Sequence, residues 1–308
     1  MKPRRIRFQR GWISVGGVVA LLYLTFSPLF HLGFHLLGGF QRIGEITYLG
    51  SSLPKTQQKK ISQTHTQATA KLQRFWGVPK AKPQVVICAN ERQFRSICRQ
   101  SEGAGCSLGT PMGTWVILLD QDTDVLAHEL AHSEMIHRWG YWSTRLKIPT
   151  WLEEGIALQV DDRFVHGTDS LSRFQDFDTE WQVMTFGGRY GPALADISES
   201  QDFFHGSEAE VRLAYLTAGR EVSGWWAMHG RRFIWKEVAR YLDQSWWEVM
   251  TNGMTGDARV WDLKPQSLFY ERELDTPRWY TSHNLGARHP GVSLDRPERS
   301  WPRSTQRQ

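Results

Sequence analysis

DTDVLAHELAHSEMIHRW, at residues 122–139, is the stretch of sequence that decides the fold. It predicts a helix, because residues 122–124 offer side-chain oxygens for an N-cap and Gly140 can end the last turn. His128 and His132 stand one turn apart in this helix. At about 100° of rotation per residue, His132 lies about 40° from His128 around the axis. Both imidazoles therefore face one side of the helix, at a spacing that lets them share one metal ion.

Glu129 follows the first histidine directly and lies about 100° away from it around the helix. Its carboxylate is therefore expected beside a metal held by His128 and His132, where a general base acting on a metal-bound water stands. The alternative interpretation is two surface histidines on a polar helix face. An apolar strand, predicted just before the helix at residues 114–119, is the context of a metallopeptidase and favours the metal site.

A catalytic zinc site usually has three protein ligands and a water, so a third ligand is needed. One known pattern, His-Glu-x-x-His-x-x-Gly-x-x-His, supplies a third histidine from the same stretch. That pattern is excluded here, because Met135 stands at the glycine position and Arg138 at the histidine position. His137 is one residue off, and it points about 180° away from His128.

A second helix, predicted from Pro149 to about Val160, offers a carboxylate instead. Its sequence begins PTWLEEGIA and contains Glu153 and Glu154 side by side. Either glutamate would complete a set of two imidazoles and one carboxylate, a ligand set found in catalytic zinc sites. The pattern of residues alone leaves the two glutamates about equal.

At this point the chain resembles the gluzincin metallopeptidases of the zincin fold, many of which carry Trp-Leu-x-Glu-Gly-x-Ala after the His-Glu-x-x-His helix. The matching residues are Trp151, Leu152, Glu154, Gly155 and Ala157. The resemblance implies that Glu154 is the third zinc ligand and that Glu153 is a solvated neighbour. It also implies one Zn²⁺ per chain as cofactor, and hydrolysis of a peptide or protein substrate.

A weaker resemblance follows further along the chain. Residues 194–197, 203–204 and 214–215, with a helix before Gly230, are similar to the C-terminal region of small single-domain gluzincin-like peptidases. The whole resemblance covers about residues 60–252. Larger gluzincins stabilise the oxyanion with a Tyr or His on this side, which implies Tyr215 as a catalytic residue. The alternative is a tyrosine that only packs on its helix.

These patterns predict an α+β, zincin-like fold over residues 61–255: a small N-terminal sheet with the active-site helix, then a mostly helical part. By analogy with zincins, the strand at 114–119 is the edge strand that pairs with an extended substrate. The other expected elements are a helix at 61–76, a strand at 83–88, a short helix at 91–98, a loop at 101–113 and a broken helical region at 208–249.

The N-terminal part predicts one transmembrane helix that acts as a signal-anchor. The uncharged run Trp12–Phe30 has the 19 residues that a bilayer crossing needs. Basic residues at 1–10 precede it, which places the N-terminus in the cytoplasm and the catalytic domain on the periplasmic or extracytoplasmic side. A cleaved signal peptide is the alternative, but no clear small-x-small cleavage site follows the run. We expect the anchor at 11–40 and a linker at 41–60.

The net charge of +5 is concentrated at the two ends of the chain. The middle is close to neutral, which gives nucleic-acid binding little electrostatic support. The C-terminal region at 256–308, rich in Pro and Arg, is expected to be an extended, largely disordered basic tail.

The chain has three cysteines and no Cys-x-x-Cys pair, which argues against a cysteine zinc site. In an oxidising compartment, Cys98 and Cys106 are near enough in sequence to bridge across a glycine-rich loop. Cys88 would then remain as a free thiol.

Three classes of function are consistent with the sequence. A membrane-anchored zinc metallopeptidase comes first, because every residue that directly binds the metal is present. The alternatives are a catalytically inactive zincin-like domain that acts as a membrane-tethered binding or scaffold module, and a scaffold that acts through its basic tail. An intramembrane protease is excluded, because charged residues such as Asp120, Asp124 and Glu134 surround the motif.

Overall fold

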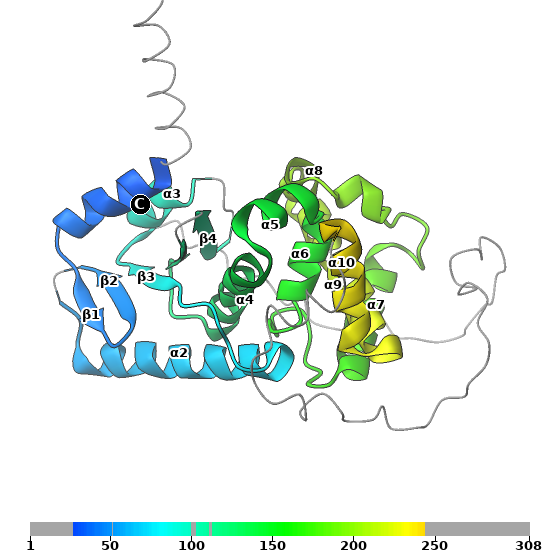
Figure 1. The fold of residues 1–308 in the computed structure, drawn as a ribbon, viewed down its shortest axis with the longest axis horizontal. Helices are drawn as coiled ribbons and strands as arrows, with labels where there is room; N and C mark the ends of the chain where they lie inside the picture. Colours follow the sequence, from blue (N-terminus) through cyan, green and yellow to red (C-terminus); the bar gives the residue numbers. More distant parts are fainter. Residues whose placement is uncertain (1–26, 51, 100–102, 111–112, 244–308) are drawn as a thin grey trace, which may run out of the picture. The chain divides into compact units, whose positions relative to one another are not determined.

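The computed structural model describes residues 27–50, 52–99, 103–110 and 113–243 (Figure 1). Within these ranges the fold is mixed α+β and mostly helical, as predicted. Residues 1–26 of the predicted N-terminus and anchor lie outside the described residues, and so does the predicted tail at 256–308.

The strands in the described ranges form one five-stranded sheet in the order β1-β2-β3-β5-β4. Strands β2, β3 and β5 run parallel to one another, whereas β1 and β4 are antiparallel to their neighbours and lie at the two edges. The strands are β1 (Gln41–Ile43), β2 (Ile46–Leu49), β3 (Gln84–Cys88), β4 (Gly105–Thr110) and β5 (Gly113–Leu118).

Side chains alternate between the two faces of the sheet along each strand. Helices pack on the apolar side chains of both faces. On one face, Val85 and Ile87 of β3 belong to a large apolar core that also contains residues of α2 (Lys55–Trp76) and α4 (Thr123–Trp139). On the other face, Val86 packs with apolar residues of α3 (Glu91–Ile97) and of the helix at 27–37. Figure 1 shows α2 and the helix at 27–37 on opposite sides of the strands.

Most of the remaining described chain is helical, and these helices lie against α4 and against one another. Helix α6 contacts both α4 and α9, and α7 lies along α9. The remaining elements are α5 (Tyr141–Lys147), α6 (Thr150–Ala157), α7 (Ser170–Met184), η1 (Leu194–Ile197), α8 (Ser200–Phe204), α9 (Glu208–His229) and α10 (Arg231–Leu242).

The helix that carries the histidine motif agrees with its predicted bounds. Asp122 is the N-cap of α4, and its carboxylate accepts the backbone N–H groups of Asp124 and Val125. The helix ends at Gly140, which has a φ of 85° that few other residues adopt. The predicted break in the second helical region is also confirmed, because Gly230 separates α9 from α10 with a φ of 76°.

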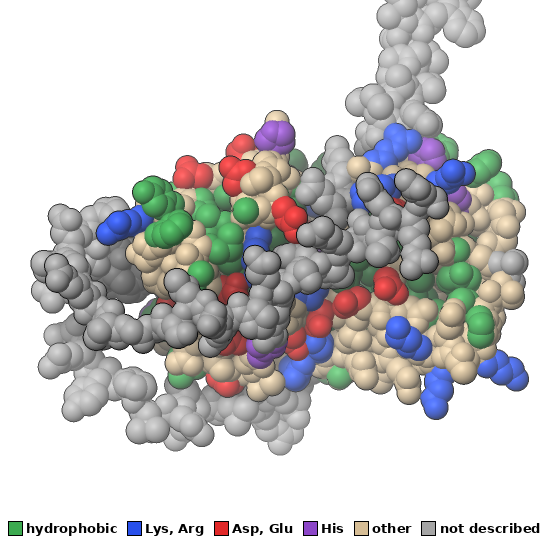
Figure 2. Space-filling view, turned by 180° about the vertical axis from the view of Figure 1, so that it is seen from behind, with side chains coloured by type: hydrophobic (Ala, Val, Ile, Leu, Met, Phe, Trp, Pro, Cys, Tyr) green, Lys and Arg blue, Asp and Glu red, His purple; other side chains and the backbone are tan. Residues whose placement is uncertain are grey.

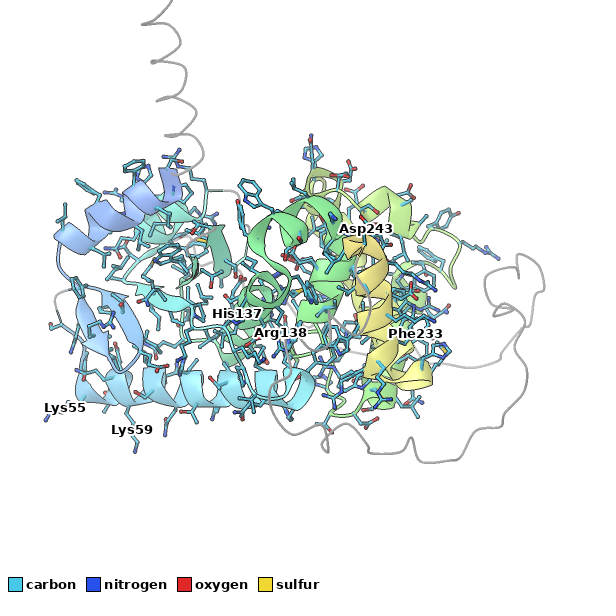
Figure 3. All side chains as sticks on the ribbon, viewed as in Figure 1. Lys55, Lys59, His137, Arg138, Phe233 and Asp243 are labelled. Atoms are coloured by element: carbon cyan, nitrogen blue, oxygen red, sulfur yellow. A yellow bond between two sulfur atoms is a disulfide. The ribbon has the colours of Figure 1, made fainter. Side chains whose placement is uncertain are left out.

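Buried charged and aromatic side chains hold α4 against α2 and against the segment that follows α2. Glu134 is fully buried and accepts the backbone N–H groups of Lys80 and Ala81, as well as Nε of Arg138 at 2.6 Å. The guanidinium of Arg138 lies 5.1 Å from the centre of the Trp76 ring. Figure 3 shows Arg138 where the end of α4 approaches α2. These contacts hold the motif helix rigidly in the core.

The predicted linker at 41–60 is wrong. This segment contains β1, β2 and the first turns of α2, and Ile46 and Leu49 of β2 are buried in the two cores. The two strands are short and are joined at Gly44, whose φ is 61°, so they carried too little apolar pattern to be recognised. The folded part of the chain therefore begins well before residue 61.

The prediction for the sheet edge next to the motif is also wrong. Residues 101–113 were expected as a loop, but they contain β4. Strand β5 therefore lies inside the sheet, between β3 and β4, and the edge strand is β4. The bridge between Cys98 and Cys106, with a Cα–Cα distance of 6.1 Å, ties the end of α3 to this edge strand and leaves Cys88 free and buried.

Residues 27–37, the C-terminal part of the predicted anchor, form a helix that packs on the sheet. Leu32 is only 3% exposed and lies in a cluster with Val86, Phe94 and Ile117. An anchor extending to residue 40 is therefore wrong, because these residues belong to the folded domain. No helix in the described ranges combines the length and apolar character that a bilayer crossing requires.

Candidate metal centre

The candidate site lies where three helices meet the edge strand. Helix α4 supplies His128, Glu129 and His132, α6 supplies Glu154, and α9 supplies Tyr215. The close approach of α6 to α9 depends on the glycine after Glu154. A Cβ atom at position 155 would lie 2.6 Å from the backbone oxygen of Ala218, which no ordinary packing allows. A glutamate followed by glycine thus lets α6 carry its carboxylate into the site.

His128, His132 and Glu154 form a buried group whose ligand atoms all lie within 4.8 Å of one another. Nε2 of His128 is 3.1 Å from one carboxylate oxygen of Glu154, and Nε2 of His132 is 3.5 Å from the other. Both rings therefore turn the same nitrogen toward one carboxylate. Among the described residues this is the one group of at least three His, Cys, Asp or Glu side chains that is arranged to hold a metal.

These distances suit a metal ion at the centre of the group. Donors that sit 2.0–2.1 Å from a tetrahedral zinc ion are about 3.4 Å apart. The observed separations of 3.1 and 3.5 Å lie on either side of that value. Both separations between the imidazoles and the carboxylate are therefore close to those of a tetrahedral zinc site. The donor set, two imidazoles and one carboxylate, is also one that zinc uses in catalytic sites.

Two further carboxylates lie behind the histidine rings. Nδ1 of His132 is 3.1 Å from Oε1 of Glu153, and Nδ1 of His128 is 3.2 Å from Oδ2 of Asp161. Metal-binding histidines commonly direct their second nitrogen to a carboxylate, which fixes the ring and the tautomer. Glu153 is only 7% exposed, so the prediction that it is a solvated neighbour is wrong. It lies behind His132 and not in the metal group.

Sequence reasoning did not find Asp161, which is fully buried just beyond α6. Its carboxylate accepts the backbone N–H of Arg163 and also pairs with the guanidinium at 2.5–3.0 Å. Arg163 thus compensates the negative charge that faces His128. The only signal in the sequence was an acidic residue shortly after the helix that carries Glu154. Two such residues, Asp161 and Asp162, stand there, and the sequence does not distinguish them.

The ionisation of the group follows from these pairings. Burial alone would raise the pKa of Glu154, but the charges and hydrogen bonds of His132 and His128 outweigh it and hold the pKa well below its usual range. Burial would lower the pKa of His132, but Glu154 and Glu153 raise it well above its ordinary value. Burial would lower the pKa of His128 too, but Asp161 and Glu154 outweigh it and raise the pKa above its ordinary value. The group is therefore a network of mutually stabilised charges.

Glu129 lies beside the metal group and is held by the edge strand. The hydroxyl of Ser107 in β4 donates to Oε2 of Glu129 at 2.7 Å and also contacts its backbone oxygen at 3.0 Å. At Gly105, a Cβ atom would lie 3.0 Å from Cγ of Glu129, so glycine leaves room for this side chain. The carboxylate is thus oriented between α4 and the strand that borders the site.

Tyr215 reaches the site from α9. Its ring centre is 6.3 Å from that of His128, and it packs against Phe164 and Phe203. Burial and the negative charge of Glu154 raise the pKa of its hydroxyl well above the ordinary value, so the hydroxyl keeps its proton. A protonated hydroxyl next to the metal group is a hydrogen-bond donor.

Figure 2 shows Asp and Glu side chains along the middle of the molecule seen from behind.

The structure thus brings together all five residues singled out from the sequence, His128, Glu129, His132, Glu154 and Tyr215. Comparison of the chain with protein-family models, with curated proteins and with solved structures found no match.

Proposed function

We propose that this chain is a zinc-dependent peptidase of the gluzincin type, with a zincin-like fold. The observation that carries the proposal is the convergence of Nε2 of His128 and Nε2 of His132 on the carboxylate of Glu154. Each ring is backed by a further carboxylate, as metal-binding histidines usually are.

Glu129 is the proposed general base. Zinc bound by His128, His132 and Glu154 supplies a Lewis acid that makes water more acidic. Glu129 takes a proton from the attacking water and later delivers it to the nitrogen of the leaving amine. The hydrogen bond from Ser107 orients the carboxylate for both transfers.

The proposed substrate is an extended peptide or protein segment lying along β4. An edge strand has unpaired backbone groups on one side, and a peptide can pair with them as an added strand. Ser107 in β4 contacts Glu129, so a peptide beside this strand would pass close to the base. The disulfide between Cys98 and Cys106 stiffens β4 and supports a location in an oxidising, extracytoplasmic compartment. The uncharged run that begins at Trp12 is the proposed segment that enters the membrane.

The protonated hydroxyl of Tyr215 is the proposed donor to the oxyanion of the transition state. Tyr215→Phe removes this hydroxyl and keeps the ring that packs on Phe203. We expect kcat to fall about 10²–10³-fold, the usual effect of losing one oxyanion donor, with KM and zinc content little changed. Steady-state kinetics and metal analysis check this. An unchanged kcat would limit Tyr215 to packing.

The proposal as a whole is tested by the metal content and the hydrolytic activity of the purified full chain. We expect one zinc per chain and cleavage of an unfolded protein such as reduced casein. Removal of zinc with a chelator should abolish cleavage, and one equivalent of zinc should restore it. Zinc binding without any cleavage would instead favour a catalytically inactive binding module, and a chain that binds no zinc would refute both.

A further inference from the structure

We propose that the folded domain rests on the lipid surface, with the helix at residues 27–37 lying in the lipid–water interface. The helix turns an apolar stripe outward: Phe30 is 60% exposed, Phe34 72% and Leu37 88%. Phe40, just beyond the helix, is 51% exposed. Exposed aromatic and aliphatic side chains in such a row are unusual for a surface that meets only water.

The stripe is separate from the face by which the helix packs on the protein. At about 100° per residue, Phe34 and Leu37 lie within about 40° of Phe30 around the axis. Leu32 points the other way into the apolar cluster under the sheet, with Leu36 packed against it. The helix is thus apolar on both sides, and the domain covers only one of them.

Arginines of α3 border this stripe. The helix at 27–37 contacts α3 and the residues just after it through two hydrogen bonds, between His35 and Ser96 and between His31 and Arg99. Arg92, Arg95 and Arg99 are all exposed on or just after α3, and the one acidic residue of α3, Glu91, is paired with Arg95 at 2.8 Å. An apolar stripe beside exposed arginines suits acyl chains next to lipid phosphates.

The residues that precede the stripe in the sequence also favour contact with lipid. Residues 12–30 carry no charge, so the stripe continues directly from a segment that is apolar enough to enter a bilayer. On the opposite side of the sheet, α2 carries polar residues at its surface, and Figure 3 shows Lys55 and Lys59 pointing away from the helix at 27–37. The metal group is carried by α4 and α6, whose apolar residues belong with those of α2 to the core on the other face of the sheet, away from the helix at 27–37.

The test uses the full chain in vesicles of phosphatidylcholine and phosphatidylglycerol. In a Cys88→Ser background, which leaves no free thiol, Phe30→Cys, Phe34→Cys, Leu37→Cys and Lys59→Cys are each labelled with an environment-sensitive nitrobenzoxadiazole dye. Acyl-chain-brominated phosphatidylcholine is then added as a quencher. We expect blue-shifted emission and a similar loss of intensity at positions 30, 34 and 37, with neither at 59.

Three outcomes would overturn the proposal. A steep fall in quenching from position 30 to 37 would mean an upright helix, because about 10 Å of rise separates these residues along the axis. Blue-shifted emission without quenching would mean that protein, such as a second copy of the chain, covers the stripe. Release of the full chain by alkaline carbonate, with position 34 as exposed to water as position 59, would mean no lipid contact at all. Far-ultraviolet circular dichroism controls for folding of each variant.

Discussion

Glu154→Ala should leave the purified chain without zinc, whereas Glu153→Ala should retain it. Glu154 supplies the carboxylate that faces both Nε2 atoms, so its removal leaves two ligands where a catalytic site needs three. Within the metal group, Glu153 faces Nδ1 of His132, on the far side of the ring, and its carboxylate also lies 3.9 Å from the guanidinium of Arg145. Loss of such an outer partner weakens metal binding by about 10–100-fold. Removal of the ligand should cost much more than this.

The two glutamates form a matched pair, because they are adjacent in α6 and equally buried, at 7% and 6% exposed. Both variants remove a buried carboxylate of the same size, so general effects on folding should be similar. Zinc content after dialysis, followed by competition with a chromogenic chelator, measures the difference. Loss of zinc from the Glu153 variant together with full retention in the Glu154 variant would reverse the ligand assignment.

The motif helix and its ligands could be predicted from the sequence because the signals are local. The N-cap at Asp122, the stop at Gly140 and the one-turn spacing of the histidines all lie within one helix. Nothing outside this helix is needed to place both imidazoles on one face. The choice between Glu153 and Glu154 was different, since both lie in the same turn of α6. It depended on a family resemblance, and the observed geometry agrees with the choice of Glu154.

The carboxylates behind the histidines could not be predicted, because they depend on how α6 packs on α4. Glu153 was expected in solvent, because the family resemblance that implied Glu154 as the ligand implied a solvated neighbour at 153. Here the site is deep enough for both to be buried, and each faces a different nitrogen. Asp161 lies beyond the end of the helix, and its position follows from the turn that pairs it with Arg163.

The edge strand β4 was missed because its residues have a low strand propensity. The packing of α4 against the strand nevertheless requires them. Its sequence, GCSLGT, contains two glycines, which disfavour strands. Both are needed where α4 lies against the strand. A Cβ atom at position 105 would be 2.6 Å from Cγ1 of Val125, and one at position 109 would be 2.6 Å from Cδ1 of Ile136. The same glycines that hide the strand in the sequence allow the helix with the motif to approach it.

Glu129→Gln should keep zinc and lose hydrolysis. Glutamine has nearly the same shape as glutamate, and its amide oxygen can still accept the hydrogen bond from Ser107 that the carboxylate accepts at 2.7 Å. It cannot take a proton from water at neutral pH. Loss of a positioned general base typically lowers the rate by about 10²–10⁴-fold, so we expect kcat to fall by at least this range. Zinc content and thermal unfolding should match those of the wild type.

Ser107→Ala separates the orientation of the base from its chemistry. The hydroxyl of Ser107 lies 2.7 Å from Oε2 and 3.0 Å from the backbone oxygen of Glu129, so its removal should leave the proton acceptor present but less well held. We expect a smaller fall in kcat, about tenfold, which corresponds to roughly 1.4 kcal/mol, the order of one hydrogen bond. In the double variant with Glu129→Gln the serine substitution should have no further effect, because the hydroxyl then orients nothing that reacts.

Hydrolysis at the wild-type rate by Glu129→Gln would remove Glu129 from the mechanism. Loss of zinc together with activity would make it a residue that shapes the site instead of a base.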